Sequence, residues 1–274
     1  MPAINSWLVA ATDQLSKADI TSARLDAELI LAHTLRKGRT YLHAHSDEPL
    51  EARHQEIADA RLRLRLDHVP IAYIIGHKEF YGRRFKVTTA TLIPRPESED
   101  IVTLTKQLLL PTAYHLPSTK LIDVGTGSGC LGLTMKLELP ELDVTLVDIS
   151  QQALNVARSN AKLLQADVTI LRNNLLANYP FKLDFIIANL PYVDPDWERS
   201  VETNYEPREA LFAPNHGLGL ITQLIDQTPA TLSGGGYLIL EADPAQHAAI
   251  IAYAEQYHLR LVTTMHYCIA FQKS

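Results

Sequence analysis

Four consecutive residues, Asn189, Leu190, Pro191 and Tyr192, follow an apolar run and carry groups that can hold a planar nitrogen. An amide nitrogen is a poor nucleophile because its lone pair is delocalised into the carbonyl group. The side-chain oxygen of Asn189 can accept one N–H of such a target, and the backbone carbonyl of Leu190 can accept the other. These two acceptors would orient the nitrogen and favour the charge that develops on it during attack. The ring of Tyr192 can pack against the planar group.

This tetrapeptide is open to two interpretations. Asn, Pro and Tyr are common after a strand, so a simple turn is one of them. The other is a catalytic segment, because the tetrapeptide resembles the N-P-P-Y motif of methyltransferases that act on planar amide or amino nitrogens. That chemistry needs no strong general base, since the nitrogen can lose its proton after methyl transfer. The features that follow favour the catalytic interpretation.

A glycine-rich turn, Gly125-Thr126-Gly127-Ser128-Gly129, follows an apolar strand and opens a helix. Glycines suit a tight turn whose backbone a ligand approaches closely. The free N–H groups at the start of a helix can bind a carboxylate or a phosphate. Ligands bind beyond the carboxyl ends of the strands in a parallel sheet, so this turn and residues 189–192 should lie at one edge.

A rival pattern is present in the same turn. Gly127, Gly129 and Gly132 spell the G-x-G-x-x-G of dinucleotide-binding proteins. The strand ends directly before Gly125, however, which favours the G-x-G-x-G arrangement usual in methyltransferases. Asp148 ends the next strand, where an acid can bind ribose hydroxyls, and both interpretations require it there. A purely structural role beside a helix N-cap is the alternative for Asp148.

The elements that must position these residues alternate between strands and helices from about residue 97. Such alternation predicts an α/β domain with a mainly parallel sheet and helices on both faces. The two runs in the tail are close enough to form an antiparallel pair, which gives the sheet an antiparallel C-terminal strand. The expected strands cover residues 120–125, 143–148, 168–171, 183–189, 237–242, 259–264 and 266–272, with a helix at 150–164.

The first 75 residues or so have helical patterns instead. Helices are expected at residues 22–36 and 51–67. Gly38 follows the first of them, and Pro70 follows the second. The arginine-rich run at positions 61, 63 and 65 is predicted to be solvated surface, with a partner-docking face as the alternative. The apolar residues assigned to the helical stripes are Leu25, Leu29, Ala32, Leu35, Ile57, Leu62, Leu64 and Leu66.

A change of pattern at residue 79 separates the two regions. Residues 79–94 are rich in aromatic and β-branched side chains around Gly82, which predicts a short hairpin. We interpret the hairpin as a bridge between domains. The expected organisation is a helical domain at 1–78, a β-hairpin linker at 79–96 and the α/β domain at 97–274.

Composition and charge exclude several classes of protein. Residues 1–85 carry 12 Lys and Arg against 11 Asp and Glu, and the remainder carries 13 against 20. This acidic excess disfavours binding to duplex DNA. The two cysteines and scattered histidines do not suggest a metal site, and few cysteines fit a reducing cytoplasm. No apolar run can span a bilayer, and the first residues do not resemble a signal peptide.

Further motifs extend along the chain. Residues 70–76 (PIAYIIG) and 79–82 (EFYG) lead into the hairpin, and residues 92–99 read LIPRPESE. Glu206-Pro207 and Ala210-Leu211 follow the tetrapeptide. The sequence thereby resembles the bacterial peptide chain release factor glutamine methyltransferases along its whole length. LIPRPESE nearly matches that family's I-P-R-P-[ED]-T-E segment, which separates it from the related ribosomal-protein glutamine methyltransferases.

The resemblance implies a Rossmann-like, S-adenosyl-L-methionine-dependent methyltransferase domain preceded by a five-helix domain that recognises the substrate protein. It implies methylation of N5 of the glutamine in the Gly-Gly-Gln loop of class I release factors, by a cytoplasmic enzyme expected to be a monomer. Residues 125–129 would hold the methionine part of the cofactor, and Asp148 would bind its ribose. Asn174 and Leu175 would flank the adenine. Asn189 is assigned to both cofactor and glutamine, and residues 190–192 to the glutamine.

Three positions depart from the family. Leu190 replaces a proline, and Asn174 stands where the family usually has Asp, although its amide oxygen can still accept from the adenine amino group. Residues 263–274 lack the family's usual acid-to-arginine ending. Pro191 pushes residue 190 toward an extended conformation, so leucine should keep the carbonyl in place. A proline at 190 should stabilise the protein slightly if φ is near −65° and the N–H is unbonded.

Other functions compete with this interpretation. A methyltransferase for a ribosomal-protein glutamine, or for adenine N6 in nucleic acid, could use the same tetrapeptide. The adenine enzyme should have a basic groove and a base-recognition domain, and this sequence shows neither. A non-catalytic binding module would dock a partner through the helices and keep only a vestigial cofactor site. An NAD enzyme would leave residues 189–192 without a purpose.

Overall fold

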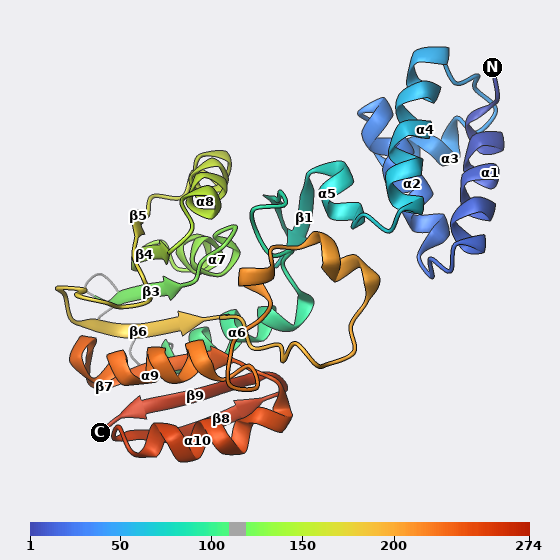
Figure 1. Cartoon of the computed structure of the whole chain (residues 1–274). Coiled ribbons are helices and arrows are strands. Elements are labelled where there is room, and N and C mark those ends of the chain that lie inside the picture. The colour runs from blue at the N-terminus through green and yellow to red at the C-terminus, as the bar shows by residue number, and fades with distance from the viewer. Residues whose placement is uncertain (110–118) are drawn as a thin grey trace. The chain divides into compact units, whose positions relative to one another are not determined.

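The computed structural model describes residues 1–109 and 119–274 of the chain. The described residues form two compact units. One unit comprises Met1–His77 together with Arg199–Tyr205, and the other comprises Lys78–Glu198 with Glu206–Ser274. The chain therefore enters the first unit twice, the second time through a short segment that follows the tetrapeptide. The order of the elements along the chain can be followed in Figure 1.

The first unit is helical. Its core is a cluster that includes Trp7, Leu8, Ile30, Leu31 and Leu62. Helices were expected throughout this region, and the two that the sequence delimited differ from the observed bounds by one residue at each end. The helices are α1 (Ile4–Lys17), α2 (Ala23–Leu35), α3 (Arg39–Ala44), α4 (Ala52–Leu66) and α5 (Ile71–Ile75).

The predicted buried faces of α2 and α4 were partly wrong. Leu25 and Leu64 are 42% and 47% exposed, whereas Arg65, predicted to be solvated, is only 2% exposed. The buried face of α4 instead runs through Ala58, Leu62 and Arg65, which are spaced by four and three residues. An arginine is tolerated on this buried face because carboxylates pair with its guanidinium group.

Two carboxylates neutralise Arg65. Its Nε donates to Asp26 Oδ2 at 2.7 Å, and its Nη2 donates to Glu202 Oε1 at 2.6 Å. Asp26 is itself buried on α2 and also accepts from Ser22 Oγ at 2.8 Å. Glu202 belongs to the segment Arg199–Tyr205, so this ion pair ties that segment to the helical unit.

The second unit is built on a seven-stranded sheet in the order β5-β4-β3-β6-β7-β9-β8. Neighbours from β5 to β7 are parallel, and β9 is antiparallel to both β7 and β8. The mainly parallel sheet with an antiparallel C-terminal strand is confirmed. The strands are β3 (Lys120–Val124), β4 (Asp143–Asp148), β5 (Thr169–Arg172), β6 (Leu183–Ala188), β7 (Leu232–Glu241), β8 (Leu259–Met265) and β9 (Cys268–Lys273).

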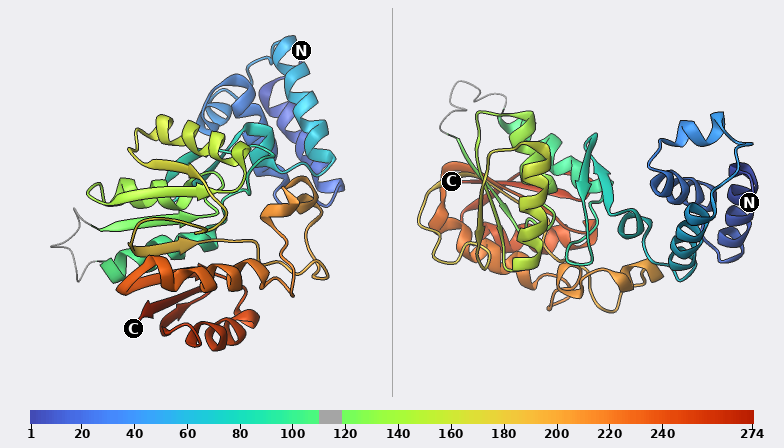
Figure 2. Two further views of the ribbon diagram at one scale, coloured as in Figure 1. Left: turned by 60° about the vertical axis from the view of Figure 1, so that its left-hand side comes forward. Right: turned by 90° about the horizontal axis from the view of Figure 1, so that it is seen from above.

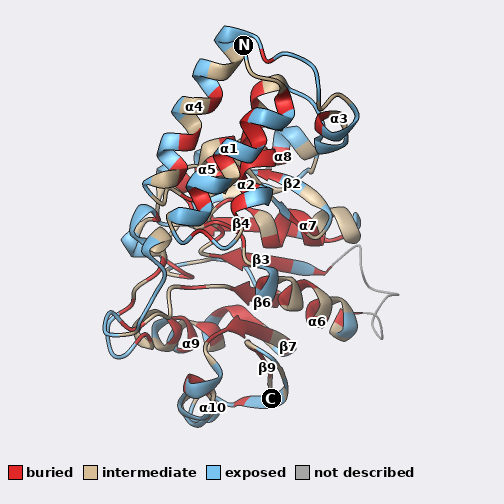
Figure 3. Ribbon diagram, turned by 90° about the vertical axis from the view of Figure 1, so that its right-hand side faces the viewer, coloured by how far each residue is buried: buried red, intermediate tan, exposed pale blue. Residues whose placement is uncertain are grey.

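Helices cover both faces of this sheet (Figure 2). Successive residues of β6 alternate between two cores, because side chains of a strand point to opposite faces. Phe185 and Ile187 pack with α6 (Glu99–Leu109), α7 (Cys130–Glu138) and α8 (Gln151–Leu164). Ile186 and Ala188 pack with α9 (Gly219–Thr231) and α10 (His247–Glu255). The strands at the centre of the sheet are accordingly buried (Figure 3).

One strand begins earlier than the sequence predicted. β7 starts at Leu232, five residues before the expected start, and runs through three consecutive glycines at 234–236. Glycine disfavours strands, so the sequence pattern did not include these residues in the strand. Leu232 pairs with Leu183 and Tyr237 pairs with Phe185, and the glycines lie in the register shift between these two pairs.

The predicted hairpin also forms. β1 (His77–Phe80) and β2 (Arg83–Lys86) make a two-stranded sheet and are joined by Tyr81 and Gly82. Both linking residues have positive φ, 50° and 70°, as a tight two-residue hairpin turn requires. Phe80 and Phe85 are buried in the same cluster as α6 and α7. Within the described ranges, no helix is long and apolar enough to cross a membrane.

Candidate active site

The sheet reverses its strand order at β3 and β6, and the candidate site begins there. Val124 of β3 and Ala188 of β6 are register partners, so Gly125 and Asn189 emerge side by side from adjacent parallel strands. The crevice beyond the strand ends at such a reversal is where open α/β sheets bind ligands. The sequence-predicted site residues therefore converge on this edge because of strand order alone.

A cavity of about 1090 Å³, including the space open to solvent, lies at this edge. Residues that follow β3, β4, β5 and β6 all line it, as do residues 90–92, 94 and 95 after the hairpin. Its size suits a nucleoside-containing ligand. The predicted site residues that line it are Gly125, Thr126, Gly127, Ser128, Asp148, Asn174, Leu175, Asn189, Leu190 and Pro191.

Two predicted site residues, Gly129 and Tyr192, are not among the lining residues. Gly129 has φ of 84° at the N-cap of α7, and a Cβ there would lie 2.8 Å from Leu133 Cδ1. Its glycine is thus required for packing behind the turn. The hydroxyl of Tyr192 donates to Glu241 Oε1 at 3.0 Å. Gly129 thus supports the lining from behind, whereas Tyr192 directly follows the lining residue Pro191 and has its hydroxyl held by Glu241.

The glycine turn presents its backbone to the cavity. Gly125 and Gly127 have φ of 71° and 55°, in the left-handed region that favours glycine. A Cβ on Gly127 would meet no atom closer than 4.0 Å, so a ligand can approach the chain closely at this point. A Cβ on Gly125 would lie only 2.7 Å from Leu190 Cδ2. These observations fit the methionine part of the expected cofactor.

Asp148 combines a structural role with a lining position. Its Oδ2 accepts from Gly127 N at 2.9 Å, and its Oδ1 accepts from Ser150 N at 2.8 Å. Ser150 in turn caps α8 by accepting from Ala153 N at 3.2 Å. An ionised carboxylate has about four acceptor positions, so Asp148 can accept a further hydrogen bond from a ligand. Burial raises the pKa of Asp148, and the backbone N–H donors act against that shift.

The part of the cavity that is expected to hold the adenine is formed by the residues after β5. Asn174 and Leu175 line it as predicted positions, together with Asn173, which the sequence reasoning missed. Asn173 N donates to the backbone oxygen of Asp148 at 3.1 Å, and its Nδ2 donates to Leu175 O at 3.2 Å. Asn173 thus ties this loop to the end of β4. Its position directly after a strand was the signal that could have identified it.

Asp123 is a second residue that the sequence reasoning passed over. Its Oδ2 accepts from Thr126 Oγ1 at 2.6 Å and from Gly132 N at 2.9 Å, while Oδ1 has no partner in the described chain. A Cβ on Gly132 would lie 2.2 Å from Leu146 Cδ2. The third glycine of the dinucleotide-like pattern therefore lets α7 pack on the sheet. Asp123 stabilises the turn through these hydrogen bonds and does not line the cavity.

Burial raises the pKa of Asp123 to about 6 from the usual 3.8, and Asp148 contributes to the shift. Between these two values the unfolded chain is ionised while the folded protein keeps its proton, so stability falls as pH rises. We expect the free energy of unfolding of wild type to fall by about 2 kcal/mol relative to that of Asp123→Asn between pH 4 and pH 7. Urea titrations of both proteins across this range measure the difference. A difference independent of pH would contradict the expectation, and Asp143→Asn, at the exposed start of β4, is the control.

Asn189 is held by residues distant in sequence. Its Nδ2 donates to Ser98 Oγ at 2.8 Å, and Ser98 Oγ donates to Glu241 Oε2 at 2.6 Å. No hydrogen bond among residues 1–109 and 119–274 uses Asn189 Oδ1. This oxygen is therefore available to accept a hydrogen bond. The sequence reasoning missed Ser98 and Glu241 as members of the site.

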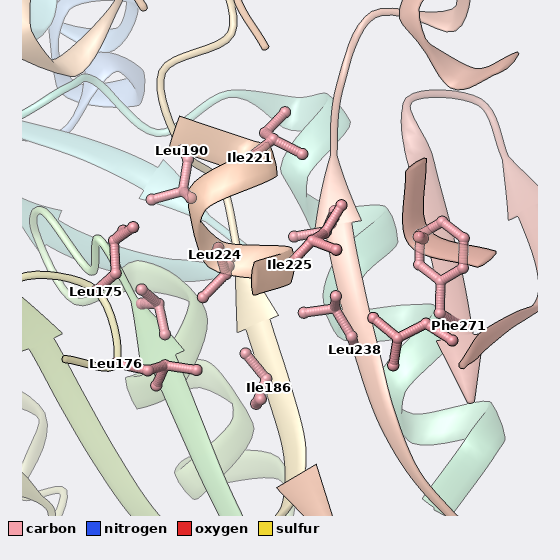
Figure 4. Close-up of a cluster of buried hydrophobic side chains, with 14 of the residues drawn as sticks. Leu175, Leu176, Ile186, Leu190, Ile221, Leu224, Ile225, Leu238 and Phe271 are labelled. Atoms are coloured by element: carbon pink, nitrogen blue, oxygen red, sulfur yellow. The ribbon is translucent and has the colours of Figure 1, made fainter. Parts of the chain in front are cut away.

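Leu190 places its side chain in the core. It is 3% exposed and belongs to the cluster around α9, as Figure 4 shows. The same side chain fills the space over Gly125. The residue that departs from the family pattern therefore packs against the glycine turn, in addition to supplying a backbone carbonyl.

Leu190→Pro is expected to lower the free energy of unfolding by about 1–3 kcal/mol, because it removes buried side-chain atoms. The gain from a stiffer unfolded chain, about 0.4–1 kcal/mol, does not offset this loss. Turnover at temperatures well below melting should stay within a few-fold of wild type, since the carbonyl remains. Thermal melts and turnover assays test both statements, with Leu190→Ala as the control for lost packing. A proline variant more stable than wild type would show that the packing contributes little.

The segment 92–99 borders the cavity through Pro94, Arg95 and Ser98. Glu206 is buried and accepts from Ile93 N at 3.0 Å while pairing with Arg95 Nη2. This glutamate therefore joins two of the segments on which the family resemblance rests. No group of three or more His, Cys, Asp or Glu in the residues that the structure describes is arranged to hold a metal ion.

Comparisons with known proteins agree with this geometry. Residues 6–76 match the PrmC N-terminal domain, and residues 98–204 match the methyltransferase small domain. The release factor glutamine methyltransferase of Koribacter versatilis is 37% identical over 245 residues, covering 86% of each chain. The enzyme of the same name from Salmonella typhimurium is 37% identical over 253 residues, covering 90% of this chain and 88% of that one.

A solved structure shares the fold. It is the 16S rRNA N2 G1207 methyltransferase of T. thermophilus in complex with AdoMet and guanosine, with a TM-score of 0.52 at 14% identity. The match covers 72% of this chain and 50% of that one. At this identity the likeness concerns the fold alone. From its sequence relatives, its fold and its site, the chain belongs to the release factor glutamine methyltransferase family and is an S-adenosylmethionine-dependent methyltransferase.

Proposed function

We propose that this enzyme methylates N5 of the glutamine in the Gly-Gly-Gln loop of class I release factors. The main support for this proposal is that the glycine turn, Asp148 and the acceptors at Asn189 and Leu190 line one cavity. The names of the sequence relatives and the segment at 92–99 supply the substrate. A cofactor site beside two acceptors for one –NH2 group fits methyl transfer to an amide.

The cofactor's place follows from the cavity lining. Residues 125–128 would receive the methionine part, Asp148 the ribose hydroxyls, and Asn174 with Leu175 the adenine. S-adenosylmethionine supplies an electrophilic methyl group. The chain's contribution is to hold that group near the end of β6, where Asn189 emerges.

The target amide would be held by two oxygens. Asn189 Oδ1 would accept one N–H, and the carbonyl of Leu190 would accept the other. These contacts strengthen as the nitrogen becomes positive during attack, which lowers the barrier rather than only tightening binding. The nitrogen can release its proton to solvent afterwards, so no basic side chain is required. Tyr192 is proposed to pack along the plane of the amide.

The helical unit is proposed to recognise the body of the release factor. Binding energy gained far from the glutamine can be used to position the Gly-Gly-Gln loop. Folded release factor should therefore react far better than a short peptide with the same loop. The proposal has the enzyme act as a monomer in the cytoplasm, without binding nucleic acid directly.

Mass spectrometry of purified release factor tests the proposed function. The factor is incubated with the enzyme and methyl-labelled S-adenosylmethionine, then digested and mapped. One labelled methyl group on the glutamine of Gly-Gly-Gln is the expected result. Label on DNA adenine or a ribosomal-protein glutamine in parallel reactions, with none on the release factor, would refute it. So would equal rates for peptide and folded protein.

Asp148→Ala is expected to weaken S-adenosylmethionine binding by roughly 5- to 150-fold, or about 1–3 kcal/mol, because the ribose hydroxyls lose their acceptor. Isothermal titration calorimetry measures the affinity directly, and wild type should bind in the micromolar range. Asp143→Ala, at the exposed opposite end of β4, is the matched control and should bind normally. Equal affinities for wild type and Asp148→Ala would show that Asp148 does not bind the ribose of the cofactor. Thermal melts of each variant separate this effect from unfolding.

A further inference from the structure

A buried carboxylate lies behind Asn189. Glu241, at the end of β7, is 1% exposed and accepts two hydrogen bonds. Ser98 Oγ donates to its Oε2 at 2.6 Å, and Tyr192 OH donates to its Oε1 at 3.0 Å. Ser98, 2% exposed, accepts in turn from Asn189 Nδ2 at 2.8 Å. Four residues from three distant stretches of sequence thus form one network.

The direction of each hydrogen bond in this network follows from the carboxylate. An ionised carboxylate can only accept, so Ser98 must donate its single hydroxyl proton to Glu241. With that proton committed, Ser98 can only accept from Asn189. The end of the Asn189 amide that faces Ser98 must therefore be Nδ2, and Oδ1 must face the cavity.

Opposing influences act on the ionisation of Glu241. Burial raises its pKa, while side-chain hydrogen bonds from Ser98, Tyr192 and Asn189 stabilise its charged form. Burial and the charge of Glu241 both raise the pKa of Tyr192, so its phenol keeps the proton that it donates. Glu97 is the further charged group that acts on Glu241.

We propose that Glu241 and Ser98 are positioning residues that fix the polarity of the Asn189 amide, so that an acceptor faces the target nitrogen. The inference rests on the proposed function, since it concerns the same amide-binding site. A neutral partner in place of Glu241 would let Ser98 donate to Asn189, and the amide could then rotate. A rotated Asn189 would present N–H donors to the N–H donors of the glutamine, and the target would be repelled.

Substitution of Ser98 separates the hydroxyl from the packing. Ser98→Ala removes the acceptor for Asn189 Nδ2, and we expect kcat to fall by about 10- to 100-fold through misplacement of Oδ1. The affinity for S-adenosylmethionine and the melting temperature should change little. Ser98→Thr keeps a hydroxyl and should recover most of the turnover. Equal losses of kcat in both variants, or none in Ser98→Ala, would overturn the proposal.

Reversing the polarity of the network gives a sharper test. Asn189→Asp puts a second acceptor against Ser98, whose proton is already committed to Glu241, and turnover should fall strongly. Adding Glu241→Gln places an amide nitrogen that can donate to Ser98, which can then donate to the carboxylate at position 189. Every group is again paired, one carboxylate remains, and an acceptor still faces the target. Turnover of the double variant should exceed that of Asn189→Asp by at least about tenfold, a coupling within the range for contacting residues.

If Glu241 had only a structural role, the losses of turnover caused by Asn189→Asp and Glu241→Gln would add. Failure of the rescue would therefore overturn the proposal. A readout without release factor keeps the two proposals apart. In spectra of ¹⁵N-labelled enzyme with S-adenosylmethionine bound, Ser98→Ala should shift the Asn189 side-chain amide signals and speed their exchange with solvent. Unchanged signals would refute the positioning role. Shifted signals, with no methylation of release factor by wild type, would refute the proposed substrate alone.

Discussion

Asn189→Ala is expected to lower turnover of release factor by about 10²–10³-fold, the largest effect on catalysis of any single substitution in this chain. The reason is that Oδ1 lies at the cavity edge without a partner in the described part of the chain, where it can accept from the amide as positive charge develops. Removal of one such preorganised contact costs about 2.7–4 kcal/mol in comparable sites. The carbonyl of Leu190 would remain but could not orient the nitrogen alone.

The measurement is single-turnover kinetics with saturating S-adenosylmethionine and excess enzyme over release factor, which isolates the methyl-transfer step. The loss should appear in the rate of that step, with a much smaller change in cofactor affinity. Asn155→Ala, on the exposed side of α8, is the control and should react at the wild-type rate. A variant at position 189 that lost only cofactor affinity would assign the residue to the cofactor and not to the glutamine.

Arg65→Met should produce the largest loss of stability, about 3–5 kcal/mol for the helical unit, because it leaves Asp26 buried with only the hydroxyl of Ser22 as a partner. An uncompensated buried charge is strongly destabilising. The substitution also removes the ion pair with Glu202, one of the contacts that hold the segment Arg199–Tyr205. Replacing Asp26 by leucine in the same chain should restore most of the loss, because no lone charge then stays buried.

Urea unfolding of the full chain provides the measurement. The fluorescence of Trp7, buried in the helical unit, reports on that unit when Trp197 is replaced by phenylalanine in all proteins compared. Arg63→Met is the matched control, since Arg63 is exposed on the same helix and should change stability by less than about 0.5 kcal/mol. Similar midpoints for the two methionine variants would mean that the buried pair contributes no more than a surface charge.

The features that could be predicted from sequence are those whose signal is local. Apolar runs located the strands of the sheet to within one or two residues, except at the start of β7, because a buried strand leaves its mark on adjacent residues. Turn chemistry located the glycine loop and the hairpin for the same reason. The rule that ligands bind beyond the carboxyl ends of parallel strands then placed Gly125 and Asn189 at one edge of the sheet. That they are direct neighbours comes from the pairing of β3 with β6.

Helix faces were less predictable than helix bounds. In α4 the alternating arginines and leucines fit more than one buried face, so Leu64 was chosen where Arg65 is buried. Only the position of Asp26 on α2, and of Glu202 far along the chain, makes burial of an arginine favourable. Helical periodicity does not contain that information, because it records the spacing of side chains and not their partners.

By itself, then, the sequence determined the α/β alternation, the glycine turn, the tetrapeptide after β6 and the family to which these belong. The tertiary structure alone decided that Leu190 fills the space over Gly125, and that Ser98 and Glu241 stand behind Asn189. The physical reason is distance along the chain. A motif can specify which groups are present at a strand end, but the direction of a hydrogen bond depends on which buried carboxylate the fold brings beside it.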